Sequence, residues 1–203
     1  MFITFEGPEG GGKTSLIEKV FRKMREAGIP ALATKEPGGT PAGACIRELL
    51  LRSDGTPLGK RAELLLFLAD RAQHVEECII PALRENRTVL CDRFNDSTLA
   101  YQGVARGEEG PFLESLCRFA GSDLVPDLTF LLDLPPEVGL RRRRGGVDRM
   151  EKEDVFFHTK VREGFLRLAE KAPSRFRVVD ATRPREDVLR SVLDELEHLF
   201  TPL

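Results

Sequence analysis

Tryptophan is absent from the sequence, tyrosine occurs once, and neither sign of charge is in large excess. The 31 Lys and Arg residues are offset by 33 Asp and Glu residues, which leaves a formal net charge of −2. A nearly neutral chain has no overall attraction for nucleic acid or for an anionic membrane surface. We therefore expect neither partner, and any affinity for anions must come from local clusters of basic residues.

Cysteine and long apolar runs are also scarce. The longest apolar run covers residues 64–69, far short of the ~20 residues that span a bilayer, and the first residues lack the basic segment of a signal peptide. No Cys-x-x-Cys pair is present, which argues against a zinc site, a redox dithiol or a disulfide framework. The sequence predicts a cytoplasmic protein with four cysteines packed in the core or within helices: Cys45, Cys78, Cys91 and Cys117.

Short apolar segments alternate along the chain with amphipathic ones, which is typical of an α/β protein with a parallel sheet covered on both faces. The expected strands are residues 2–5, 31–35, 88–91, 128–132 and 177–179. The expected helices are residues 13–27, 43–52, 58–85 (with Pro81 able to kink it), 96–105, 112–120, 136–144, 151–171 and 185–200. With 203 residues and no linker or repeat, the chain is expected to form one domain over residues 1–203.

The segment between the first expected strand and helix matches the nucleotide-binding pattern G-x-x-x-x-G-K-[ST] in full. Its glycines let backbone N–H groups turn inward around a phosphate, and the N-terminus of the following helix adds its dipole. Lys13 can reach the outer phosphates of a nucleoside triphosphate, and the Thr14 hydroxyl can ligate Mg²⁺. The candidate nucleotide-binding residues here are Gly7, Pro8, Glu9, Gly10, Gly11, Gly12, Lys13, Thr14 and Ser15.

This pattern is shared by GTPases, motors and small-molecule kinases. The guanine-reading tetrapeptide N-K-x-D is absent, and a motor would be longer. The chain length therefore favours a nucleoside or nucleotide kinase, on analogy of fold alone. A P-loop binding module that hydrolyses ATP slowly as a signal is the alternative from another class.

Two further clusters could form a second phosphate site. Asp92 and Arg93 directly follow the third expected strand, where the acid can hold Mg²⁺ and the guanidinium can clamp a phosphate. Residues 141–149 read RRRRGGVDR, and the glycines favour a mobile lid over about residues 141–150 that brings arginines onto the phosphates. A surface salt bridge and a solvated basic helix end are the alternatives for these two clusters.

Several longer stretches carry a resemblance to a known family. They are residues 6–14 (EGPEGGGKT), 36–40 (EPGGT), 46–51 (IRELLL), 66–71 (LFLADR), 92–103 (DRFNDSTLAYQG) and 148–151 (DRME). Among P-loop kinases, the segments EPGGT and STLAYQG are specific to one family. The likeness to that family extends over nearly the whole chain. The sequence resembles the bacterial thymidylate kinases.

The resemblance implies transfer of a phosphoryl group from ATP to dTMP with Mg²⁺, a step of dTTP synthesis; a kinase of another nucleotide is the nearest alternative. It implies a three-layer α/β/α sandwich with a five-stranded parallel sheet, a short Arg-rich lid and a homodimer. The consecutive apolar residues 64–68 agree with a dimer, because one stripe of that helix can face the core and another a partner helix. A helix buried wholly within one subunit is the alternative.

The resemblance also implies where dTMP binds. Phe67 should stack on thymine, Arg71 should donate to its O4, and Tyr101 should lie beneath the deoxyribose. Without the resemblance, core packing for the two aromatic residues and an ion pair for Arg71 are the simpler interpretations. The other implied acceptor residues are Arg47 and Arg93 on the phosphate, Glu36 and Pro37 nearby, Glu9 at the sugar 3′-hydroxyl or the phosphate, and Ser97, Thr98 and Gln102 near the base.

Two positions depart from the family pattern. Some members carry a catalytic arginine inside the phosphate loop, whereas here Gly10 follows Glu9, so the missing cation has to come from the lid. Phe94 stands where many relatives have Tyr or His, which keeps the ring and removes a polar contact. The candidate catalytic residues are then Lys13, Arg93, Arg149, Glu9 and Asp92, with Arg142, Arg143 and Arg144 as helpers of Arg149. Thr14 and Asp92 are the candidate Mg²⁺ ligands, and Arg142, Arg143 and Arg183 join the ATP-binding residues, with residues 180–183 bordering the adenine.

Overall fold

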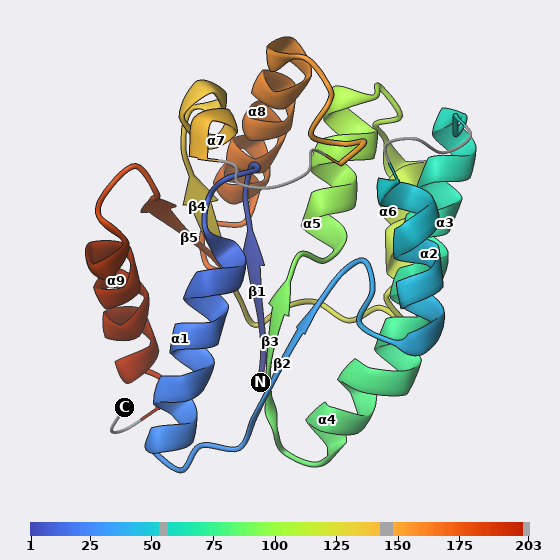
Figure 1. Cartoon of the computed structure of the whole chain (residues 1–203). Helices are drawn as coiled ribbons and strands as arrows, with labels where there is room; N and C mark the ends of the chain where they lie inside the picture. The colour runs from blue at the N-terminus through green and yellow to red at the C-terminus, as the bar shows by residue number, and fades with distance from the viewer. Residues whose placement is uncertain (53–56, 143–147, 201–203) are drawn as a thin grey trace.

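The computed structural model describes residues 1–52, 57–142 and 148–200, and Figure 1 shows its central sheet between two layers of helices. The strands are β1 (Phe2–Glu6), β2 (Ala31–Lys35), β3 (Thr88–Asp92), β4 (Leu128–Asp133) and β5 (Phe176–Asp180). They run parallel in the order β2-β3-β1-β4-β5. The predicted α/β class and the five-stranded parallel sheet are confirmed.

Helices connect the strands. They are α1 (Lys13–Glu26), α2 (Pro41–Leu51), α3 (Lys60–His74), α4 (Ile80–Arg84), α5 (Asn95–Thr98), α6 (Pro111–Ala120), α7 (Pro136–Arg142), α8 (Val155–Lys171) and α9 (Arg185–Glu197), with π-helical segments η1 (Val75–Ile79) and η2 (Leu99–Ala105). α1 and α9 cover one face of the sheet, and α8 lies on the opposite face beside η2 (Figure 1). Within the described ranges, no helix has the length and the apolar character needed to cross a bilayer.

Three predicted helices differ clearly from the observed ones. The helix predicted for residues 96–105 is the short α5 followed by the π-helical η2. The helix predicted for residues 58–85 begins at Lys60 and passes through the π-helical segment η1 before α4. Pro81 has no N–H for the carbonyl four residues earlier, and the wider π-helical turn lets the chain continue past it. The helix predicted for 151–171 begins only at Val155, because the side chain of Asp154 caps it by accepting from the Phe157 N–H at 2.7 Å.

The core explains why the apolar patterns of the sequence hold. All five residues of β1 are buried, as expected for a central strand of a parallel sheet with both faces covered. α1 buries the stripe Leu16, Ile17, Val20 and Met24 against this sheet, at the spacing of one helical face. The packed strands hold their carboxyl ends at one edge, and the first of them leads directly into residues 7–12.

Candidate active site

Residues 7–12 form a tight loop between β1 and α1, as the motif predicts. Gly7 and Gly10 have φ angles of 133° and 74°, which residues with a Cβ rarely adopt. A Cβ on Gly10 would also collide with the backbone of Gly139 in α7. Because these positions are glycines, the loop can pass close to the backbone of α7. The N–H groups of the loop then remain available for an anion at the N-terminus of α1.

Lys13, the first residue of α1, is buried beside this loop. Its Nζ donates to the carbonyl oxygens of Gly7 and Pro8, each at 3.0 Å. Burial lowers the pKa of Lys13, and the nearby charge of Arg93 acts in the same direction. The ammonium is thus held at the mouth of the loop by two main-chain oxygens, where the outer phosphates of a triphosphate would lie.

Thr14 and Asp92 meet at the edge of the sheet. The hydroxyl of Thr14 donates to Oδ2 of Asp92 at 2.8 Å, although Asp92 ends β3 and lies 78 positions away. A hydroxyl oxygen and a carboxylate beside a phosphate loop are the oxygen ligands that Mg²⁺ prefers. The donor set therefore fits a magnesium ion at this point.

Arg93 lies between the phosphate loop and η2. Its backbone has a φ of 72°, an uncommon value for a residue with a side chain, and its guanidinium donates to the Gly7 carbonyl at 3.2 Å. It forms an ion pair with Glu9 and lies 5.1 Å from the ring centroid of Tyr101, whose hydroxyl donates to Glu9 at 2.8 Å. Burial would raise the pKa of Glu9, but the charges of Arg93 and Lys13 outweigh it and lower this pKa to about 2.

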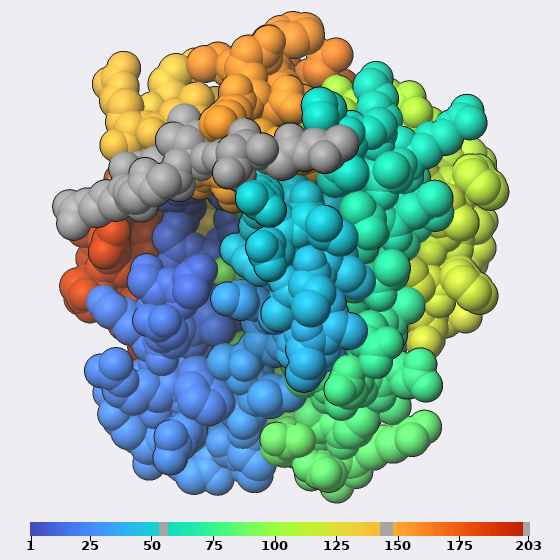
Figure 2. All heavy atoms as spheres, turned by 45° about the vertical axis from the view of Figure 1, so that its right-hand side comes forward, coloured from blue at the N-terminus to red at the C-terminus, as the bar shows by residue number. Residues whose placement is uncertain are grey.

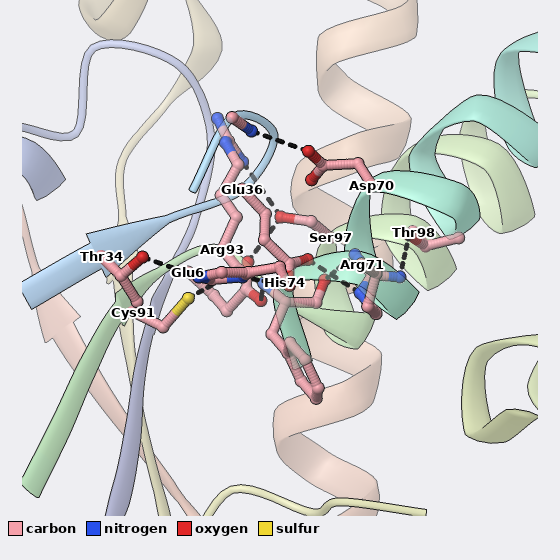
Figure 3. A network of polar contacts seen from close by, with 12 residues as sticks. Glu6, Thr34, Glu36, Asp70, Arg71, His74, Cys91, Arg93, Ser97 and Thr98 are labelled. Carbon is pink, nitrogen blue, oxygen red and sulfur yellow. Dashed lines mark hydrogen bonds and ion pairs between the residues drawn. The ribbon is translucent and has the colours of Figure 1, made fainter. Parts of the chain in front are cut away.

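Arg71 is held at the other end of the site by fixed acceptors. It is 2% exposed, and it donates to Glu36 at 2.8 Å, to the Thr98 hydroxyl at 2.8 Å and to the Phe94 carbonyl at 3.0 Å. A guanidinium carries five N–H groups, so each of its terminal nitrogens keeps one for a ligand. The second oxygen of Glu36 is hydrogen-bonded to Nδ1 of His74 at 2.9 Å (Figure 3).

Glu6 and Asp70 accept hydrogen bonds from residues near Arg93 and Glu36 and so help to fix this end of the site. Glu6, at the end of β1, accepts from the Phe94 N–H at 2.7 Å and from the Ser97 hydroxyl at 2.6 Å. Burial raises the pKa of Glu6 to about 8, and the charge of Asp96 acts in the same direction. Asp70 accepts from the Gly38 N–H at 2.9 Å and so holds the turn after β2 (Figure 3). Neither of these two acids was among the predicted site residues.

One cavity of about 530 Å³ brings most of the predicted residues together. A volume of this size suits a nucleotide. The phosphate loop closes one end, α2 and α3 form a wall, and α5 with η2 form another. The predicted residues that line it are Glu9, Gly10, Gly12, Lys13, Thr14, Ser15, Glu36, Pro37, Arg47, Phe67, Arg71, Asp92, Arg93, Ser97, Thr98, Tyr101 and Gln102.

A smaller cavity of about 70 Å³ lies on the other side of the phosphate loop. Gly10 to Gly12, Arg142 and Arg183 line it, on the side predicted for adenine. Arg142 donates to the carbonyl oxygens of Ala181 and Thr182 at 2.6 and 3.0 Å. Its guanidinium is therefore bound to the segment after β5 and does not reach over the loop.

The structure places Arg149 away from the phosphate loop. Its Nε donates to the Leu50 carbonyl at 2.8 Å and its Nη1 to Glu63 at 2.7 Å, and it is not among the described residues that line the large cavity. Arg143 and Arg144 lie outside the described residues. Of the predicted catalytic arginines in the described ranges, Arg93 is the one that is bound to the loop, through the Gly7 carbonyl and Glu9.

Several buried polar residues of this site were missed from the sequence. Glu63, Asp70 and His74 are each no more than 1% exposed, and all three lie on α3 together with Phe67 and Arg71. The spacing 63, 67, 70, 71 and 74 follows one helical face, and this spacing was the available signal. The expectation of packed cysteines holds for Cys91 and Cys117, whereas Cys45 is exposed because its side of α2 faces away from the core.

Comparison with known proteins gives a consistent result. A sequence profile of the family described as thymidylate kinase matches residues 5–192. The thymidylate kinase of Carboxydothermus hydrogenoformans is 52% identical over 200 residues, covering 98% of this chain and 97% of that protein. The thymidylate kinase of Chlamydia trachomatis is 46% identical and covers 98% and 100% of the two chains. The crystal structure of the thymidylate kinase from Ehrlichia chaffeensis superposes with a TM-score of 0.80 at 32% identity, over 97% of this chain and 98% of that one.

Proposed function

Because this chain belongs to the thymidylate kinase family, and is therefore an enzyme that phosphorylates dTMP to dTDP, we propose that ATP is the donor, that Mg²⁺ accompanies it, and that dTMP occupies the large cavity. One observation carries the proposal. The same cavity holds the loop ammonium of Lys13 at one end and the buried guanidinium of Arg71 beside Phe67 at the other. A nucleotide monophosphate that spans these ends would point its phosphate at the loop.

The donor phosphates would be held by the N–H groups of residues 7–14 and by Lys13. Phosphoryl transfer needs the attacking and leaving oxygens in line and charge stabilised on the moving group, with little covalent work for the protein. Lys13 is already fixed at the loop by two carbonyl oxygens, so it needs no reorganisation when charge develops. Its contribution should therefore appear mainly in kcat.

Thr14 and Asp92 would hold Mg²⁺, Thr14 directly and Asp92 directly or through water. When bound, the ion supplies positive charge between the donor phosphates. The two side chains already share a hydrogen bond at the edge of the sheet, so each oriented oxygen is in place before a ligand arrives.

The acceptor would be held by its base and by its phosphate. Phe67 offers a ring for stacking and Arg71 offers N–H groups for O4 of thymine. Arg47 donates to the Pro37 carbonyl at 2.8 Å and lines the cavity, so it and Arg93 are the cations for the dTMP phosphate. Arg93 also lies next to the loop, which makes it the bridge between the two phosphate sites.

We further propose a homodimer. α3 packs against both α2 and α6, and Figure 2 shows these helices together on one side of the molecule. Large apolar side chains on them are exposed: Leu49 on α2, Leu65 on α3, and Phe112 and Phe119 on α6. Single exposed apolar residues are ordinary, but several on adjoining helices mark an interaction surface. The chain as a whole is proposed to act as one domain in the cytoplasm. The proposed lid covers about residues 141–150, of which 143–147 lie outside the described residues.

A coupled assay tests the function. With ATP and Mg²⁺, we expect dTMP to be the best acceptor among dTMP, dUMP, dCMP, UMP and dGMP. Lys13→Ala should lower kcat by about 10²-fold or more while the protein stays folded. Equal use of all pyrimidine monophosphates would contradict dTMP as the preferred acceptor, and a folded Lys13→Ala variant with normal kcat would contradict the role of the loop.

A further inference from the structure

Glu63 is a buried carboxylate just outside the large cavity. It lies on α3, one turn before Phe67, and is 1% exposed. One oxygen accepts from the side-chain amide of Gln102 at 2.9 Å. The other accepts from Arg149 at 2.7 Å and from Nη2 of Arg106 at 3.2 Å, and Nε of Arg106 makes a longer contact of 3.4 Å to the first oxygen. One acid thus joins a cavity residue to two arginines.

The two arginines keep Glu63 ionised. Burial would raise its pKa, but the hydrogen bond from Gln102 and the charges of Arg106 and Arg149 outweigh this and lower the pKa. An ionised carboxylate can only accept hydrogen bonds. The group that Gln102 turns toward Glu63 must therefore be its NH₂, which settles an orientation that the shape of an amide leaves open.

The amide oxygen of Gln102 is then free for a ligand. Gln102 lines the large cavity, and no group within residues 1–52, 57–142 and 148–200 donates a hydrogen bond to this oxygen. Arg71, on the same cavity, offers only donors. The cavity therefore presents an acceptor at Gln102 and a donor at Arg71.

We propose that Glu63 is a positioning residue for base selection, which holds the oxygen of Gln102 toward the base and so favours thymine over cytosine. The inference rests on the proposed binding of dTMP in this cavity. Thymine and uracil carry an N–H at N3 beside an oxygen at position 4, and cytosine has an acceptor at N3 beside an amino group. The pair of Gln102 and Arg71 matches the first pattern and opposes the second.

Glu63→Gln is the sharpest test because it keeps the shape and removes the charge. Arg149 and Nη2 of Arg106 can only donate, so the new amide must turn its oxygen to these two shorter contacts and its NH₂ to Gln102, and it loses only the 3.4 Å contact from Nε of Arg106. Gln102 must then turn over to accept, and its own NH₂ enters the cavity. That NH₂ suits the N3 acceptor of cytosine and opposes the N3–H of thymine.

The measurement is the ratio of kcat/KM for dTMP to that for dCMP. We expect Glu63→Gln to lower this ratio by about tenfold or more. The matched control is Arg106→Lys, which loosens the same cluster and keeps the carboxylate ionised, and its ratio should stay within about twofold of the wild type. A merely structural role for Glu63 would lower both kcat/KM values together and leave the ratio unchanged, which would overturn the proposal.

A double-mutant cycle shows whether Glu63 acts through Gln102. Gln102→Leu removes the amide, so adding Glu63→Gln to it should change the ratio no further. An equal additional drop would mean that Glu63 acts on selectivity by another route and would also overturn the proposal. A wild-type enzyme with no preference for dTMP would instead contradict the proposed function itself.

A second measurement needs no substitution at Glu63, in case that variant does not fold. In ¹⁵N-glutamine-labelled wild-type protein, the NMR signal of the Gln102 side-chain NH₂ is assigned by its loss in Gln102→Leu. The hydrogens of this NH₂ should exchange slowly with solvent, both with and without dTMP, because the buried carboxylate of Glu63 holds them. Fast exchange in the absence of ligand would show that Glu63 does not fix the amide and would overturn the proposal.

Discussion

Glu9 of the phosphate loop and Arg93, which follows β3, form an ion pair although 84 positions separate them in the chain. The pair carries a consequence for catalysis, because the phosphate loop has no arginine of its own. Arg93 also donates to the Gly7 carbonyl, so an arginine from the segment after β3 lies beside a loop that has none. The proposed donor and acceptor phosphate sites would both border this guanidinium.

The variant Arg149→Ala tests whether the lid supplies a second cation to the transferring phosphate. If it reaches the phosphates only when the lid closes, Arg149→Ala should lower kcat far more than it raises KM for dTMP. To do so it must leave Glu63 and the Leu50 carbonyl, which hold it here. Steady-state kinetics with varied dTMP measure kcat and KM for the wild type and for Arg149→Ala. A normal kcat with a raised KM would mean that Arg149 supports the acceptor site and that Arg93 is the cation for transfer.

Tyr101 should distinguish deoxyribose from ribose. Its hydroxyl is held by Glu9 at 2.8 Å and its ring lines the cavity, so a 2′-hydroxyl would meet buried carbon. We expect Tyr101→Ala to narrow the preference for dTMP over ribothymidine monophosphate. Tyr101→Phe keeps the ring and is the control, with the preference retained. An unchanged ratio of kcat/KM in Tyr101→Ala would show that another residue reads the sugar.

His74 should make stability depend on pH above neutrality. Burial would lower its pKa, but hydrogen bonds to Cys78 and Glu36 and the charge of Glu36 raise it from 6.5 to about 9. The charged histidine is therefore favoured in the folded state, and this contribution is fully present below pH 6.5. As the pH rises from about 6.5 to about 9, the free energy of unfolding falls by up to ~3 kcal/mol because this contribution is lost.

Urea unfolding at pH 6, 7.5 and 9 measures this dependence. Burial raises the pKa of Glu6 to about 8, which also predicts a lower free energy of unfolding as the pH rises. The pH dependence of the wild type alone therefore does not isolate the contribution of His74. His74→Gln should be less stable at pH 6 and should show a clearly shallower decline toward pH 9. A decline as steep as that of the wild type would mean that His74 is not charged in the folded protein.

A charge placed at an exposed phenylalanine of α6 tests the proposed homodimer. Light scattering of the wild type should give about twice the 22.7 kDa of one chain. Phe119 is 85% exposed, and Phe119→Asp should shift the protein to the monomer because a charge would have to be buried in the interface. Phe156 on α8 is 67% exposed and lies outside the α2, α3 and α6 surface, so Phe156→Asp is the control and should remain dimeric. A monomeric wild type would contradict the proposal.

The phosphate loop and the strand ends could be predicted because they depend on local patterns. Gly7, Gly10 and Lys13 occur in one short motif between an apolar strand and an amphipathic helix. Asp92 and Arg93 directly follow an apolar strand, and parallel strands bring their carboxyl ends to the same edge. The buried acids on α3 were not predicted, since an acid at such a spacing is ordinarily solvated and nothing local names its partners.

The sequence alone determined the order of strands and helices, the nucleotide loop and the likeness to a kinase family, because these follow from neighbouring residues and from short motifs. Which charges meet depends on how the chain folds. Arg149 lies within the predicted lid, yet it is bound by Glu63, 86 positions away, and not by the phosphate loop. A buried carboxylate needs donors within hydrogen-bonding distance wherever the fold brings them, and that requirement cannot be read from the spacing of residues along the chain.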